Sequence, residues 1–124
     1  MIMLKFKFLL WMMPKLMQRA INTKPACARY VAGKNLEFQI QTLDKVGRHF
    51  RFADGQVKSF AGLTTTPKFT LTFRNADRGF KILSAKDGKE AFLAALHDED
   101  LVVSGDFVEV LWFQGFTDYL QPGK

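Results

Sequence analysis

The amino-acid sequence predicts an α+β fold in which helices cover one face of a single sheet. Apolar and polar side chains alternate within residues 36–73, as they do along half-buried strands, whereas helical spacing precedes and follows this stretch. The length of 124 residues fits one domain. We therefore expect an N-terminal helical segment and connector at residues 1–34, followed by a domain at residues 35–124.

The N-terminal segment combines apolar residues with the basic excess of the chain. Residues 1–34 hold seven Lys and Arg residues and no acid, whereas the remaining ninety residues hold eleven basic and twelve acidic residues. The first thirteen residues, MIMLKFKFLLWMM, are too few to span a membrane, which takes about 20 apolar residues. Apolar and basic side chains together are typical of an amphipathic helix that lies in the membrane interface. The residues expected to contact an anionic membrane are Lys5, Phe6, Lys7, Phe8, Trp11, Lys15 and Arg19.

Three other roles for this segment stay open. It is also suited to be a lid over the domain or a helix that binds a partner enzyme. A signal peptide with a cleavage site at residues 26–28 is a further alternative, but the polar residues before that site argue against cleavage.

Pro14 is expected to divide the N-terminal helix. Proline breaks a helix interior but suits a first turn, so a second helical piece should begin at Pro14 and end near Asn22. Residues 23–34 are then expected to form a connector.

Five strands are expected in the domain. Asp54 and Gly55 form a strong signal for a two-residue hairpin turn, because both residues tolerate a positive φ. Alternation and β-branched residues place the strands at 36–41, 49–52, 56–60, 69–73 and 101–104.

Three helices are expected after the fourth strand. Asn75 should cap a helix that runs to about Ala85, and Asp87 should cap the next helix. Asp106 and Glu109 resemble a capping box at the start of the last helix. The sequence of this last helix, FVEVLWFQGF, is apolar on almost every side, which indicates burial or contact with lipid.

The apolar side chains of the domain are expected to meet between the sheet and the helices. The chain has 13 Phe but only 2 Tyr and 2 Trp, which favours a dry interior because Phe carries no hydrogen-bonding group. Seven residues should share one face of the sheet: Phe38, Ile40, Phe50, Phe52, Phe69, Leu71 and Phe73. Seven should face them from the helices: Phe80, Leu83, Phe92, Leu96, Phe107, Val110 and Leu111. Periodicity does not distinguish a close-packed core from the wall of a cavity.

The second half of the chain resembles the sterol carrier protein (SCP-2) domain family. The resemblance is carried by PKFTLTF at 67–73, the helix with Phe80, KEAF at 89–92, and LVVSG at 101–105 before an apolar helix. The hairpins before residue 67 match the meander of the family, so the likeness covers roughly residues 35–115. It implies a five-stranded, mainly antiparallel sheet whose covering helices enclose an apolar tunnel for a lipid, lined by the fourteen residues above. Bacterial relatives include accessory proteins of ubiquinone biosynthesis.

No catalytic residue, metal site or cofactor is expected. The single Cys27 excludes an internal disulfide and a cysteine metal cage, and a reducing compartment is the simplest interpretation. His49 and His97 lack partners at metal-ligand spacing, so His49 should point to solvent and His97 should end a helix. The acids at 98–100 are interpreted as a solvated turn.

These observations predict a non-catalytic protein that binds or transfers a lipid, an isoprenoid quinone or a sterol-like ligand. It would work in the cytoplasm, peripherally attached to the membrane, as an accessory factor in ubiquinone biosynthesis, and partner enzymes are possible. Nucleic acid is not an expected partner, because apolar Met-rich helices are poor readers of phosphates. The alternative is a protein–protein adaptor with a filled core, whose N-terminal helix binds a partner enzyme.

Overall fold

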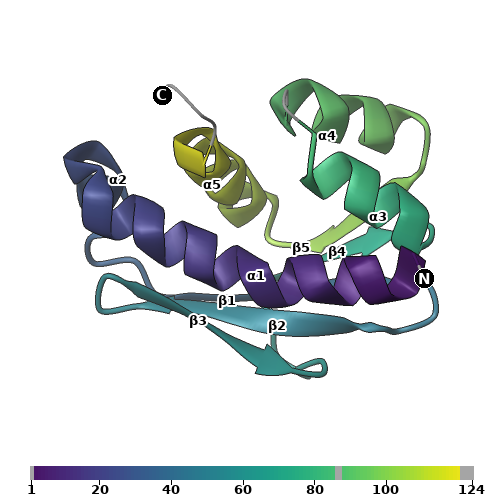
Figure 1. The fold of residues 1–124 in the computed structure, drawn as a ribbon, viewed down its shortest axis with the longest axis horizontal. Helices are drawn as coiled ribbons and strands as arrows, with labels where there is room; N and C mark the ends of the chain where they lie inside the picture. The colour runs from purple at the N-terminus through teal and green to yellow at the C-terminus, as the bar shows by residue number, and fades with distance from the viewer. Residues whose placement is uncertain (1, 86–87, 121–124) are drawn as a thin grey trace.

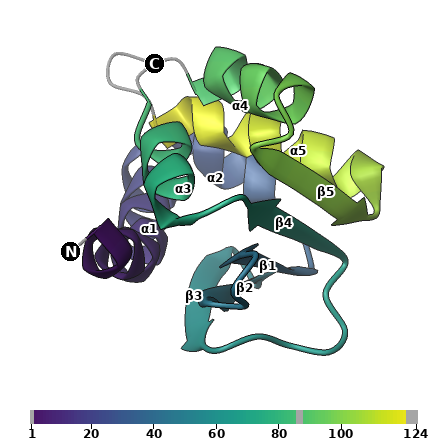
Figure 2. The same ribbon diagram turned by 90° about the vertical axis from the view of Figure 1, so that its right-hand side faces the viewer.

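A computed structural model of the chain describes residues 2–85 and 88–120 and contains one sheet and five α-helices within them. All of these helices lie on the same side of the sheet (Figures 1 and 2). The α+β class is therefore confirmed. A short 3₁₀ helix, Asp118–Leu120, follows the last α-helix.

The sheet has five strands in the order β3-β2-β1-β4-β5. The central pair β1–β4 is parallel, and the other three neighbouring pairs are antiparallel. The expected five-stranded, mainly antiparallel sheet is thus confirmed. The strands are β1 (Leu36–Thr42), β2 (Gly47–Ala53), β3 (Gln56–Ala61), β4 (Phe69–Phe73) and β5 (Leu101–Gly105).

The β2–β3 hairpin turns at the two residues that the sequence indicated. Asp54 and Gly55 have φ values of 54° and 73°, the left-handed conformation that a tight hairpin turn requires. Phe52 pairs with Val57 across the hairpin, and both side chains are buried on the face that the helices cover.

The N-terminal helix α1 (Ile2–Thr23) is continuous, so the expected break at Pro14 is wrong. The buried stripe continues through the proline, with Leu10 and Met13 before it and Met17 after it. Packing of this stripe against the neighbouring elements offsets the cost of an interior proline, which is about 3 kcal/mol. Figure 1 shows α1 lying along the sheet with α3 beside its N-terminal end.

The expected connector at residues 23–34 contains a second helix, α2 (Pro25–Val31). Pro25 occupies the first turn of this helix, where its missing N–H costs nothing. Cys27 and Val31 are its buried residues, so Cys27 does not lie in a connector as expected.

Three helices follow β4: α3 (Ala76–Leu83), α4 (Gly88–His97) and α5 (Phe107–Thr117). The Asn75 side chain accepts a hydrogen bond from the Arg78 N–H (2.9 Å), as expected of a helix cap. Asp87, the expected cap of the next helix, lies outside the described residues.

The capping box expected at α5 is only half formed. Asp106 accepts a hydrogen bond from the Val108 N–H at 3.0 Å. The Glu109 carboxylate is instead paired with the Lys34 ammonium group. Glu109 therefore ties the segment after α2 to α5 rather than closing its own helix.

The helix α3 packs against α1 through Gly79. A Cβ atom at this position would lie 2.6 Å from the Phe6 Cε1 atom and 3.3 Å from the Phe73 Cγ atom. Both Phe rings are fully buried, so neither has free space to enter. Glycine here sets how closely α3 approaches α1 and β4.

We therefore predict that Gly79→Leu lowers the free energy of unfolding by more than about 2 kcal/mol through overpacking, as measured by urea unfolding. Combining it with Phe6→Ala makes room for the new side chain, so the double variant should lose less than the sum of the two single losses. Additive losses would contradict this description of the contact.

Candidate ligand-binding interior

The face of the sheet under the helices is largely apolar. All seven strand residues expected to share one face are at most 1% exposed. Their shared, buried face is therefore confirmed. The Phe38 ring lies at its centre and contacts the rings of Phe50, Phe69 and Phe113 at centroid distances of 5.2, 4.9 and 4.6 Å.

The helix residues expected opposite this face divide into three groups. Val110 is fully buried. Four others are half-buried: Phe80, Leu83, Phe92 and Leu96. Phe107 and Leu111 are each 52% exposed, so the expectation that they face the sheet is wrong. Both lie on the side of α5 that points away from its buried residues.

Two buried side chains of α5 were not among the residues expected to face the sheet. Phe113 and Phe116 follow Val110 at intervals of three residues and cover the sheet with it. The Phe116 ring contacts the Phe52 ring at 5.0 Å. The spacing was visible in the sequence, but in a helix apolar on almost every side it does not single out one face.

The apolar inner face has a polar corner next to the β1–β2 turn. Thr42, Arg48 and Ser59 continue the inward-facing positions of β1, β2 and β3. The Arg48 Nη2 group donates a hydrogen bond to the Ser59 Oγ atom at 3.2 Å. The Thr42 Oγ1 and Arg48 Nε atoms are buried and have no hydrogen-bond partner within the described residues.

The other face of the sheet is polar. The segment between β3 and β4 crosses it, and its Thr64 N–H donates a hydrogen bond to the Gln39 side chain at 2.9 Å. A hollow of about 270 Å³ opens on the β2–β3 hairpin. Its lining residues are Arg51, Ala53, Asp54, Gln56, Lys58 and Phe60. This polar lining is unsuited to an apolar ligand.

The exposed face of α1 carries most of the residues expected to contact a membrane. Phe8 and Trp11 are 56% and 47% exposed, and their rings lie 5.8 Å apart. The basic residues of this set are exposed as well: Lys5, Lys7, Lys15 and Arg19. Phe6 is the exception, because it is fully buried against α3. None of the described helices is both long and apolar enough to cross a membrane.

The histidines and Cys27 are dispersed. The His49 ring stacks on Phe60 at 5.1 Å and contacts the Gly62 carbonyl oxygen, so it does not simply point to solvent as expected. His97 ends α4 as expected and is exposed beside Asp98. Burial raises the pKa of the Cys27 thiol, with the Lys24 ammonium opposing the shift, so the thiol stays protonated at neutral pH.

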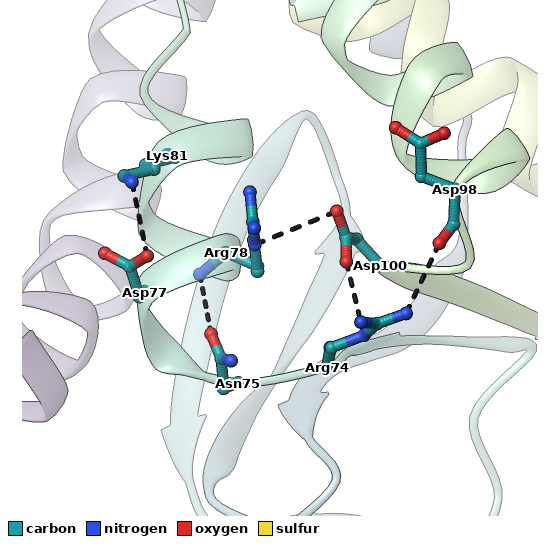
Figure 3. A network of polar contacts seen from close by, with 7 residues as sticks. All are labelled: Arg74, Asn75, Asp77, Arg78, Lys81, Asp98 and Asp100. Carbon is teal, nitrogen blue, oxygen red and sulfur yellow. Dashed lines mark hydrogen bonds and ion pairs between the residues drawn. The ribbon is translucent and has the colours of Figure 1, made fainter.

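The acids at 98–100 do not all form a solvated turn. Asp98 and Glu99 are exposed, but the Asp100 carboxylate binds two guanidinium groups, Arg74 at 3.2 Å and Arg78 at 3.8 Å. Figure 3 shows these side chains converging between β4, α3 and the turn before β5. This cluster of ion pairs links the end of β4, the helix α3 and the turn before β5. Within the described residues, no group of three His, Cys, Asp or Glu side chains is arranged to hold a metal ion.

Comparison with solved structures shows the SCP2-like fold. The structure of the ubiquinone synthesis protein UbiJ-SCP2 is similar with a TM-score of 0.69 and 15% identity, covering 93% of this chain and 97% of that one. Sterol carrier protein 2 from Yarrowia lipolytica, in its apo form, has a TM-score of 0.55 and 14% identity, covering 90% and 91%.

The same fold occurs as a part of a larger enzyme. The sec-alkylsulfatase Pisa1 from Pseudomonas sp. is similar with a TM-score of 0.57 and 13% identity, covering 72% of this chain but only 14% of the enzyme. No protein-family model and no curated protein matches the sequence. At these identities the shared property is the fold.

Proposed function

We infer that this chain binds a lipid, an isoprenoid quinone or a sterol-like molecule between its sheet and its helices, and carries it without chemical change. The single observation that carries the proposal is the fold shared with a sterol carrier protein over at least 90% of both chains. The apolar face around Phe38 supports it, because sites for apolar ligands are lined mainly by aromatic and aliphatic side chains. Twelve of the fourteen residues expected from the sequence remain the proposed lining, and Phe107 and Leu111, which face away from the sheet, do not belong to it.

The protein would meet its ligand at a membrane surface. The exposed face of α1 places Phe8 and Trp11 among basic residues, and the Lys15 ammonium lies 4.5 Å from the centre of the Trp11 ring. Such a helix lies in the interface of an anionic membrane, and each basic residue near the surface contributes about 1 kcal/mol. We therefore propose peripheral attachment to the cytoplasmic leaflet.

The pathway proposed is ubiquinone biosynthesis, in which the chain would be an accessory factor. The support is the similarity to UbiJ-SCP2, which matches nearly the whole length of both chains. A quinone with an isoprenoid tail is an apolar molecule of the kind that the inner face suits. Catalysis is not part of the proposal, because His49, His97 and Cys27 lie apart and none of them has a partner base in a cleft formed by the described residues.

We expect saturable binding when the purified protein is titrated with a fluorescent fatty acid, and displacement of this probe by a short-chain ubiquinone. Arg51→Gln, on the polar face of the sheet, is the matched control and should leave the titration unchanged. Absence of saturable binding would contradict the proposal.

That negative result would favour the alternative of an adaptor with a filled core. The close ring contacts around Phe38 are the observation in favour of this alternative. In an adaptor, the exposed face of α1 would bind a partner enzyme instead of a membrane.

A further inference from the structure

The polar corner of the inner sheet face consists of Thr42, Arg48 and Ser59, and it interrupts an otherwise apolar surface. On β2 the two inward positions that follow Arg48 are Phe50 and Phe52, which are at most 1% exposed. Arg48 itself is half-buried. A guanidinium group therefore lies at one end of a row of buried aromatic side chains.

This cation lacks the partner that burial normally requires. Arg48 forms no ion pair with an acidic side chain in the described part of the chain, and its one side-chain hydrogen bond goes to the neutral Ser59 hydroxyl. Its Nε–H group is buried and finds no hydrogen-bond partner among the described residues. A partly buried charge is costly unless it is paired, so an anionic group of a ligand would complete this site.

A second polar group, the Thr42 hydroxyl, lies at the same corner. Thr42 is fully buried, and its hydroxyl group has no hydrogen-bond partner in residues 2–85 and 88–120. Ile40 and Arg48 are direct partners across β1 and β2, so Thr42, two residues after Ile40, is the diagonal neighbour of Arg48 on the same face. The charged Arg48 Nε–H group and the neutral Thr42 hydroxyl are therefore two unpaired hydrogen-bond donors on neighbouring residues.

The residues around Thr42 place the polar corner at the periphery of the interior. Thr42 pairs with Phe73, and a Cβ atom on Gly79 of α3 would contact both Phe73 and Phe6 of α1. The corner therefore lies toward the N-terminal end of α1, and Figure 1 shows that this end lies at the edge of the molecule. A ligand with its tail along the Phe row would place its head here.

We propose that Arg48 and Thr42 form a head-group site that binds the anionic end, a carboxylate or a phosphate, of an amphiphilic ligand and adds this affinity to the apolar contacts that neutral ligands such as a quinone also make. The inference rests on the proposed function, since it assigns the polar end of the same interior. Arg48 donates charge-assisted hydrogen bonds to the anion through its guanidinium group. The Thr42 hydroxyl donates one more.

The test compares dodecanoate with dodecan-1-ol, which have the same tail length and differ in the charge of the head group. Both are used to displace the fluorescent probe from the full-length protein. We expect dodecanoate to bind on the order of tenfold more tightly than dodecan-1-ol, the effect typical of one hydrogen bond to a charged group. Equal affinities would overturn the head-group site while leaving ligand binding intact. Binding of neither compound would overturn both proposals.

Variants of Arg48 and Thr42 then test whether these residues cause the difference in affinity between dodecanoate and dodecan-1-ol. Arg48→Gln should weaken dodecanoate binding on the order of tenfold and leave dodecan-1-ol binding unchanged. Arg51→Gln removes the same charge from the same strand on the opposite face, and it should change neither affinity. Thr42→Val, which keeps the shape of the side chain, should weaken dodecanoate binding several-fold and serves as the second variant if Arg48→Gln unfolds. Equal behaviour of Arg48→Gln and Arg51→Gln would overturn the assignment.

Discussion

Replacing Phe38 by alanine is expected to lower the free energy of unfolding by about 3–5 kcal/mol. The Phe38 side chain is fully buried, and its ring contacts three other aromatic rings at centroid distances of 4.6 to 5.2 Å. Truncation removes a large apolar group from a dry environment and leaves a space that strands β1, β2 and β4 cannot close. The loss is a large part of the stability of a domain of this size.

Urea unfolding followed by circular dichroism measures this loss. Phe107→Ala is the matched control, because it removes the same side chain from a position that is 52% exposed on α5. It should cost less than about 1 kcal/mol. Similar losses for the two variants would mean that Phe38 is not the centre of the interior.

Replacing Phe8 and Trp11 together by serine is expected to reduce binding to anionic vesicles by on the order of thirtyfold or more. Burial of an apolar side chain stabilises by about 1.5–3 kcal/mol, and each of these two is already about half covered by the protein. The basic residues remain in this variant, so the change isolates the apolar contribution. Sedimentation with vesicles that contain phosphatidylglycerol gives the measurement.

The control for this variant removes an equal number of exposed apolar side chains elsewhere. Phe107→Ser with Leu111→Ser changes α5, where both residues are 52% exposed, and should leave vesicle binding intact. Loss of binding in the α5 variant alone would show that α5 meets the membrane. Deleting the whole of α1 is a poor test, because its buried residues Leu10 and Met17 belong to the core.

The sheet could be predicted from the sequence because each strand carries its own signal. Alternation of apolar and polar residues identified the buried face, from Phe38 on β1 to Phe73 on β4. The Asp54–Gly55 pair fixed the hairpin turn through the φ values that it tolerates. These are local properties, and the structure retains them.

The helices were harder to predict because their orientation depends on the elements that they contact. In α1, Phe6 and Phe8 differ by two positions, yet only Phe6 meets α3. The continuity of α1 through Pro14 likewise depends on the surfaces that its buried stripe packs against. In α5, apolar residues occur on almost every side, so periodicity did not show that Phe107 faces away from the sheet.

The unpaired guanidinium group of Arg48 was also invisible in the sequence. Arg48 precedes the strand expected at residues 49–52, and an arginine at the end of a strand usually reaches solvent. Only the structure shows that the buried Nε–H group and the buried hydroxyl of Thr42 beside it have no partner in the part of the chain that the structure describes. Such features depend on side chains brought together from separate strands.

Native mass spectrometry of the full-length protein, purified without added lipid, tests the central claim most directly. If the chain carries an apolar ligand, a fraction of the protein should retain a molecule that is released on denaturation and has the mass of a lipid or an isoprenoid quinone. The Phe38→Ala variant, if it remains folded, provides a comparison with an altered interior. A spectrum that contains only the mass of the bare chain, before and after incubation with a short-chain ubiquinone and with dodecanoate, would contradict the claim.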